Sequence, residues 1–269
     1  MEIFIKLIIF ILGASIGSFL NVLIDRLPKD ESITGRSHCD FCKEKITWYD
    51  LIPILSYFFL KGKSRCCHKK LSFQYPLVEI LTGVAFVFVF FQGQNLLGSV
   101  LIMGILSCLI VVFFSDLKYH LISDWVLLAF FAFSALYKFV SNPLCHSGLS
   151  RILSSGFWSR CVPQNDVIAA LIVGLPIFLI YYISHERAMG LGDVYLSAIM
   201  GLLLGWKAGF LALYIAFITG AVFGIVLLIL HKKKIKSKIP FGPFLVTGTL
   251  TMLFYGDKIL EIIKRMYGF

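Results

Sequence analysis

The chain has 269 residues, of which 58% are hydrophobic and only 15% are charged, and its formal net charge is +10. A soluble domain of this size usually carries about 25% charged residues, so this chain lacks the polar surface that a water-soluble fold needs. The composition excludes a soluble enzyme, a disordered protein and a conventional nucleic-acid-binding protein. It predicts a polytopic membrane protein.

Eight apolar stretches approach the ~20 residues that a helix needs to cross a bilayer. They predict an all-α protein with about eight transmembrane helices. The sixth stretch is short and contains glycine, so a tilted or half-inserted helix is also compatible with it. The stretches are residues 3–24, 76–92, 96–115, 121–140, 167–184, 190–205, 207–230 and 241–263.

The basic residues predict the orientation of these helices. Lys6 precedes the first apolar run, whereas Arg26 and Lys29 follow it, an order typical of an uncleaved anchor with its N-terminus outside. With eight spans, 17 of the 25 Lys and Arg residues lie on the cytoplasmic side, most of them in segments 25–75 and 231–240. This distribution follows the positive-inside rule and suits contact with anionic lipid headgroups. Nucleic-acid binding is not needed to explain it.

Four cysteines lie in the predicted cytoplasmic loop, where disulfides do not persist. They indicate either a metal site or reduced structural thiols. Cys39 and Cys42 have zinc-knuckle spacing, and zinc would stabilise a loop too small for its own core. Cys66 and Cys67 are adjacent, and we expect that neighbouring cysteines rarely both reach one tetrahedral ion. The histidines beside these pairs are alternative ligands: His38 and His68.

The other three cysteines fall elsewhere in the predicted topology. Cys145 and Cys161 lie in the outside loop 141–166, where a disulfide is chemically permitted. Cys108 lies in the middle of a span, and we expect it to serve packing.

Three carboxylates lie near membrane depth. Asp116 ends the third stretch, Asp193 begins the sixth and Glu79 begins the second. A charge at the bilayer centre costs at least ~2.5–3.5 kcal/mol, so such a residue is a functional candidate. Each carboxylate is also compatible with capping a helix or extending to water. Asp116 and Asp193 stand out because the eight-span topology puts both at the cytoplasmic edge.

The surroundings of Asp193 favour catalysis. Gly190 and Gly192 flank it, and glycines leave room for a substrate backbone and allow a turn. If Asp193 lies close to Asp116, the two carboxyl groups share one proton. In an aspartic protease the ionised member takes a proton from water while the protonated member polarises the carbonyl.

A proton-coupled transporter is the alternative from another class, because intramembrane acids and glycine-rich segments also serve proton relays. Transporters commonly contain inverted repeats and bind their substrates near the bilayer midplane. This sequence shows no such repeat, and its acids fall at one interface.

Six motifs occur in an order that resembles the bacterial type IV prepilin peptidases, membrane-embedded aspartic proteases with a Gly-x-Gly-Asp motif. The resemblance runs nearly end to end, and three positions depart from it. Ser123 stands in place of a proline, Ser64 in place of a cysteine and Tyr195 in place of a lysine. The motifs are Gly13–Pro28, Arg36–Cys42, Trp48–Pro53, Tyr75–Glu79, Gly190–Asp193 and Ile239–Phe244.

The resemblance implies roles for particular residues. Asp116 and Asp193 would be the catalytic aspartates. Asp124 follows the first of them in the position of a family motif residue. Substrate-binding positions would be Gly190, Gly192, Asp124 and Glu79, and structural zinc ligands would be Cys39, Cys42, Cys66 and Cys67.

The resemblance also implies a function. Such enzymes cut the basic leader from type IV prepilins or pseudopilins, after a glycine at the cytoplasmic face of the bacterial inner membrane, in type IV pilus and type II secretion systems. Many then methylate the new N-terminus with S-adenosylmethionine, whereas proteolysis needs no cofactor. A peptidase without methyltransferase activity is the second alternative. The chain would comprise a first transmembrane helix (1–24), a cytoplasmic loop domain that is the candidate methyltransferase region (25–75), and a transmembrane aspartic protease domain (76–269).

Overall fold

The computed structural model of the chain describes residues 2–35, 37–39, 41–42, 44–92, 95–141, 166–186, 189–230 and 240–267. Cys145 and Cys161 lie outside these residues. Contacts divide the chain into two units, Met1–Val111 and Val112–Phe269. The boundaries that we predicted after residues 24 and 75 both lie inside the first unit.

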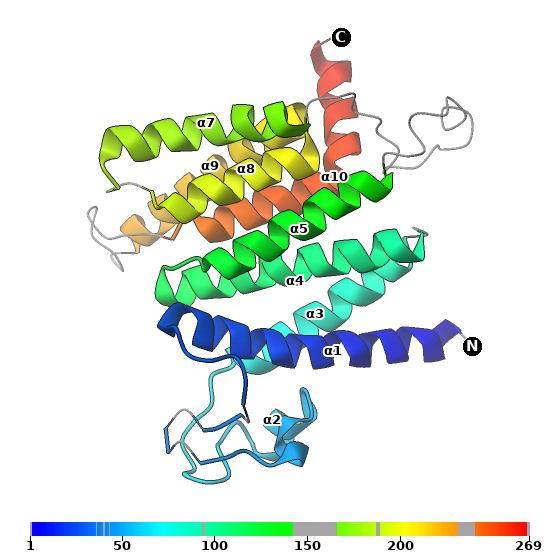
Figure 1. Cartoon of the computed structure of the whole chain (residues 1–269), viewed down its shortest axis with the longest axis vertical. Helices are drawn as coiled ribbons and strands as arrows, with labels where there is room; N and C mark the ends of the chain where they lie inside the picture. Colours follow the sequence, from blue (N-terminus) through cyan, green and yellow to red (C-terminus); the bar gives the residue numbers. More distant parts are fainter. Residues whose placement is uncertain are drawn as a thin grey trace. The chain divides into compact units, whose positions relative to one another are not determined.

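Helices form the regular structure of the described residues, in which no strand occurs and β-pairing is limited to two isolated bridges. Each of the eight predicted apolar stretches coincides, within four residues at either end, with one long helix. These helices are drawn in Figure 1. A helix satisfies its backbone polar groups internally, which a segment in lipid must do. The long helices are α1 (Glu2–Arg26), α3 (Gln74–Phe90), α4 (Leu96–Tyr119), α5 (Asp124–Ser141), α7 (Asp166–Ser184), α8 (Leu191–Leu204), α9 (Trp206–Ile229) and α10 (Gly242–Tyr267).

Within the described ranges, four helical segments are long and apolar enough to cross a membrane: Glu2–Lys29, Leu96–Tyr119, Asp166–Ser184 and Trp206–Ile229. The helices α3 and α8 are apolar but shorter. Length and composition therefore confirm a helical membrane protein. The count of eight spans stays a prediction.

In the first unit, α1 packs along α3 through small residues (Figure 1). A Cβ on Gly13 would lie 2.8 Å from the Gly83 Cα, and a Cβ on Gly17 would lie 2.8 Å from the Glu79 Cα. The missing side chains let the two backbones approach, which is how helices associate where the solvent is as apolar as they are. The connection between α1 and α3 contains η1 (Leu27–Lys29), η2 (Trp48–Leu51) and α2 (Leu55–Phe59).

In the second unit, α7 packs on α8 and α9 packs on α10. The chain passes from α8 to α9 through Gly205 alone, at a φ of 80° and a ψ of 168°, a conformation that glycine adopts without steric penalty. An ion pair of 3.2 Å between Lys138 and Asp166 joins the last turn of α5 to the first turn of α7.

Replacing Gly13 with leucine is expected to destabilise the first unit, because the new side chain would overlap the backbone of α3. Overpacking of this kind costs about 1–3 kcal/mol. The thermal unfolding midpoint of the detergent-solubilised protein measures the effect. Leu12→Ala is the matched control, since Leu12 is 57% exposed on the same helix. Equal midpoints for the two variants would contradict close packing at Gly13.

Candidate active site

Asp116 is buried in the last turn of α4, three residues before the helix ends. Its Oδ2 accepts a hydrogen bond of 2.8 Å from the backbone N–H of Gly242, the first residue of α10. Helix N-termini present unpaired N–H groups and positive potential. The start of α10 therefore holds one oxygen of this carboxyl group in a fixed place.

Asp193 is the third residue of α8 and is also buried. Its Oδ2 accepts a hydrogen bond of 3.3 Å from the N–H of Gly190. Its Oδ1 is buried without a hydrogen-bond partner among the described residues. The neighbouring Gly192 lies against Ile122, in the turn that follows Asp116, so the two carboxyl groups lie in one region of the second unit.

The two glycines beside Asp193 differ in their surroundings. A Cβ on Gly192 would lie 3.0 Å from the Cβ of Ile122, in the turn between α4 and α5. Among the described residues, the nearest atom to a Cβ on Gly190 would be the Gly192 nitrogen, 4.0 Å away. We expected both glycines to leave room for a substrate, and this stays a prediction. Gly190 has open surroundings among these residues, whereas Gly192 lies close to the turn that follows Asp116.

Two other predicted site residues lie in different settings. Asp124 begins α5 and is exposed, a position where a carboxylate is favourable because of the helix dipole. Glu79 belongs to the first unit and is buried near the start of α3. Its Oε2 accepts a hydrogen bond of 2.7 Å from the N–H of Ile54.

The role of Gly242 was missed in the sequence. Its motif, Ile239–Phe244, contributed to the family resemblance, but its spacing gives no sign of a contact with a residue 126 positions earlier. A Cβ at Gly242 would lie 2.6 Å from the Asp116 Oδ2. The one available signal is indirect, because a buried carboxylate requires a donor.

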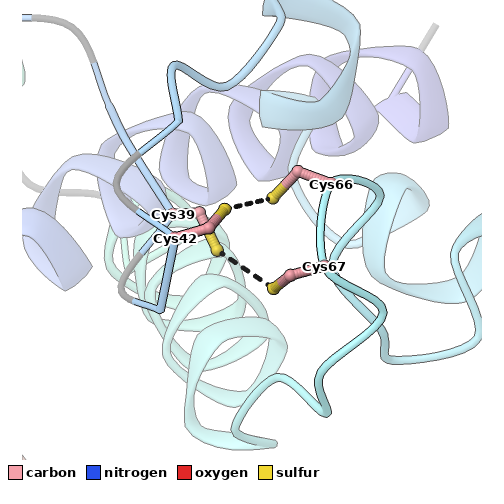
Figure 2. Close-up of side chains that lie close together, drawn as sticks. All are labelled: Cys39, Cys42, Cys66 and Cys67. Carbon is pink, nitrogen blue, oxygen red and sulfur yellow. Dashed lines mark hydrogen bonds between the residues drawn. The ribbon is translucent and has the colours of Figure 1, made fainter.

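The four loop cysteines gather in the first unit, where their sulfur atoms all lie within 4.8 Å of one another. Figure 2 shows them in two facing pairs: Cys39 Sγ lies 3.7 Å from Cys67 Sγ, and Cys42 Sγ lies 2.9 Å from Cys66 Sγ. The adjacent cysteines thus lie closer to a common centre than we expected.

A tight turn explains why both adjacent cysteines reach the cluster. The Ser64 N–H donates to the Lys69 carbonyl, and the His68 N–H donates to the Ser64 carbonyl, both at 2.9 Å. Neither histidine that we considered belongs to the group of ligand atoms. The His38 Nδ1 lies 3.5 Å from a guanidinium nitrogen of Arg26 instead.

The cluster also changes the acidity of its thiols. Burial acts to raise the pKa of Cys39, but hydrogen bonds from Ser64, the nearby backbone and Cys66 lower it overall. The hydrogen bond with Cys66 raises the pKa of Cys42. The Ser64 hydroxyl lies 3.4 Å from the Cys39 Sγ, close enough to hydrogen-bond a thiolate there.

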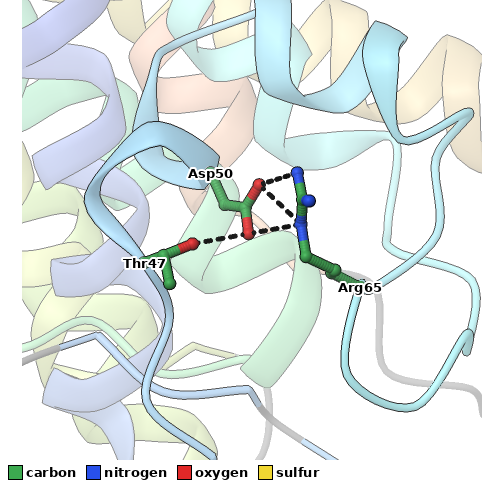
Figure 3. A network of polar contacts seen from close by, with 3 residues as sticks. All are labelled: Thr47, Asp50 and Arg65. Carbon is green, nitrogen blue, oxygen red and sulfur yellow. Dashed lines mark hydrogen bonds and ion pairs between the residues drawn. The ribbon is translucent and has the colours of Figure 1, made fainter.

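An ion pair connects the turn from Ser64 to Lys69 with η2 (Figure 3). The Arg65 Nη2 lies 2.8 Å from the Asp50 Oδ1, and the Arg65 Nε lies 3.0 Å from the Asp50 Oδ2, which makes the pair bidentate. The Thr47 hydroxyl donates to the same carboxylate at 2.8 Å. The Arg65 guanidinium also lies 5.0 Å from the centre of the Tyr49 ring.

A cavity of about 670 Å³ occupies the first unit. Its wall combines the inner face of α1, the start of α3, η2, α2 and the Arg65 turn, so it lies between the helices and the loop. Acidic and basic side chains both line it, among them Asp25, Arg26, Lys45, Asp50, Arg65 and Glu79.

Comparison with known proteins identifies the family. The profile of the bacterial peptidase A24 N-terminal domain matches residues 11–93, and that of the type IV leader peptidase family matches residues 103–225. The chain belongs to the type IV leader peptidase family. The resemblance in the sequence motifs is therefore confirmed.

Three relatives are each named prepilin leader peptidase/N-methyltransferase. The protein of Aeromonas salmonicida is 32% identical over 94% of this chain and 91% of its own length. That of Bacillus subtilis is 31% identical over 96% and 98%. That of Klebsiella pneumoniae is 34% identical over 74% and 85%. No solved structure matches the chain significantly.

Proposed function

We propose that this chain is an aspartic endopeptidase that removes the basic leader of type IV prepilins or pseudopilins after a glycine, and then methylates the new N-terminus. One observation carries the proposal: Asp116 and Asp193, from different helices, are buried in one region of the second unit. The family of the chain favours this function over a proton-coupled transporter.

The chemistry follows from the two hydrogen bonds that orient the carboxyl groups. Gly242 and Gly190 each hold an Oδ2 atom, and the Asp193 Oδ1 keeps no partner among the described residues. One carboxylate takes a proton from a water molecule that attacks the scissile carbonyl. The other carboxyl group, protonated, donates to the carbonyl oxygen. This scheme uses no cofactor.

The proposed membrane topology has eight spans, an outside N-terminus and the active site at the cytoplasmic face of the bacterial inner membrane. Asp116 near the end of α4 and Asp193 near the start of α8 suit that placement. A prepilin would keep its basic leader in the cytoplasm and its apolar helix in the lipid. Open space at Gly190 and the exposed Asp124 leave room for its backbone.

The cysteine cluster suits a structural zinc ion. A tetrahedral site with Zn–S bonds of about 2.3 Å has sulfur–sulfur edges of about 3.8 Å, and the four sulfurs lie within 4.8 Å of one another. We assign Cys39, Cys42, Cys66 and Cys67 as its ligands. Cys66 would supply the ligand that the resemblance places at position 64, where this chain has serine.

The cavity of the first unit suits S-adenosylmethionine. Its volume of about 670 Å³ lies in the usual range for small-molecule sites, about 300–1,000 Å³. Asp25 and Glu79 match the positive sulfonium and ammonium groups, and Arg26 and Lys45 match the carboxylate. When bound, this donor supplies the methyl group. The cavity thus favours the bifunctional enzyme over a peptidase alone.

The proposal predicts that cleavage and methylation can be lost separately. Asp193→Asn should abolish cleavage of a prepilin by the purified protein. Glu79→Gln should preserve cleavage but lose methylation. Mass spectrometry of the product, with and without S-adenosylmethionine, reads the leader loss and the methyl gain together. Cleavage by Asp193→Asn at the wild-type rate would overturn the assignment of the aspartates, and full methylation by Glu79→Gln would overturn that of the cavity.

Gly242→Ala should leave the protein folded but reduce cleavage. The added methyl group would move the Asp116 carboxyl group, and a displacement of about 1 Å costs about 10²-fold in rate. Gly256→Ala is the matched control on α10, because its Cβ would meet only the flexible end of Met252, at 3.3 Å. The initial rates of prepilin cleavage by the two variants are compared at equal concentrations of folded protein. Similar rates for both variants would show that the Gly242 contact does not position Asp116.

The purified protein should contain about one equivalent of zinc. Cys66→Ser should lose most of it, whereas Cys108→Ser, at a buried cysteine outside the cluster, should keep it. Elemental analysis by mass spectrometry measures the ratio. Metal-free wild-type protein that is folded and active would refute the zinc site.

A further inference from the structure

The short helix α2 has an apolar face that no described residue of the first unit covers. Phe58 is 66% exposed and Phe59 is 82% exposed, and the neighbouring Leu55 and Phe73 are exposed by more than half. The rings of Tyr57 and Phe73 lie 6.4 Å apart, so the patch is continuous between α2 and the residue that precedes α3. Large apolar groups gathered in this way mark an interaction surface.

Two observations place α2 beside the membrane helices and not beyond their ends. The Ile54 N–H, at the start of α2, donates to Glu79, the sixth residue of α3 and about 7.5 Å along its axis. Ser15 of α1 and Tyr57 of α2 line the same cavity, although about 16 Å of helix separates Ser15 from Arg26 at the end of α1. The short helix α2 therefore lies beside α1 and α3 within the first unit.

The backbone of this segment is suited to contact with lipid. Besides the bond from Ile54 to Glu79, the N–H groups of residues 55, 56, 58 and 60–63 donate to carbonyls within the segment. Backbone groups that enter lipid without a partner cost several kcal/mol each. These bonds allow the segment to leave water without that penalty.

Basic side chains follow the apolar face directly. Lys61 and Lys63 are exposed after α2. Lys69 and Lys70 are also exposed, and Lys70 forms an isolated β-bridge with Lys63. An apolar face with a basic border is typical of segments that lie in the membrane interface. The lysines are complementary to anionic lipid headgroups.

We propose that α2 is an interfacial membrane element. It inserts Leu55, Phe58 and Phe59 into the leaflet on the side of the loop, while Lys61 and Lys63 bind anionic headgroups. Its partner is the anionic bilayer itself. The element would hold the mouth of the cavity at the membrane surface, where the end of a transmembrane substrate helix emerges.

Photocrosslinking tests this placement in the full-length protein. Benzoylphenylalanine replaces Phe59, and the protein is reconstituted in nanodiscs of phosphatidylglycerol and phosphatidylcholine, with and without a prepilin. Leu12, exposed on α1, is the positive control for lipid contact. Phe41, between Cys39 and Cys42, is 50% exposed under the Lys69 ammonium group and is the matched control outside the patch.

Mass spectrometry is expected to find phospholipid adducts at positions 59 and 12 and few at position 41. Phosphatidylglycerol should be enriched several-fold over phosphatidylcholine at position 59, and Lys61→Gln with Lys63→Gln should remove the enrichment. Adducts at position 12 but none at position 59 would overturn the proposal. Adducts of position 59 with the prepilin in place of lipid would also overturn it, since the patch would then be a substrate surface.

Discussion

Three buried carboxyl groups, on α3, α4 and α8, each accept a hydrogen bond from a backbone N–H. Gly242 donates to Asp116, Gly190 donates to Asp193 and Ile54 donates to Glu79. Burial removes such groups from water, so the fold loses several kcal/mol of stability unless the protein supplies a hydrogen-bond partner. The requirement fixes where α10 begins relative to α4, and where the loop segment before α2 rests on α3.

Small residues make these approaches possible. Gly242 has no side chain to push the Asp116 carboxyl group away, and Gly17 lets α1 reach the backbone of Glu79. Gly192 admits Ile122 at the turn that follows α4. A glycine thus stands near each of these three acids because the backbone must come close enough to donate or to pack, and larger residues would separate the helices.

The loop between α1 and α3 is held by different means. Among its described residues from 27 to 73, only Cys39 and Ser64 are buried, so it has no hydrophobic core of its own. The sulfur cluster, the bidentate pair of Asp50 and Arg65, and the bond to Glu79 replace that core. Our proposed zinc ion and bilayer contact would add to them, because small segments of this kind need such support.

The sequence by itself determined the eight helical stretches, three of the acids in apolar surroundings and the family, because each depends on local information. It gave no sign of Asp25, which is also buried. A run of about 20 apolar residues becomes a helix in lipid whatever its neighbours are, and motif order needs no coordinates. Helix boundaries agreed within a few residues. The sequence also singled out Asp116 and Asp193 as exceptions in an apolar setting.

Only the tertiary structure decided which distant segments meet. Gly242 became part of the site because α10 begins beside Asp116, a contact across 126 positions. Cys66 joined the cluster through the turn from Ser64 to His68, and Gly192 was found close to Ile122. Spacing along the chain fixes distances within one helix or turn. It does not specify the packing between helices, which depends on the combined shape of many side chains.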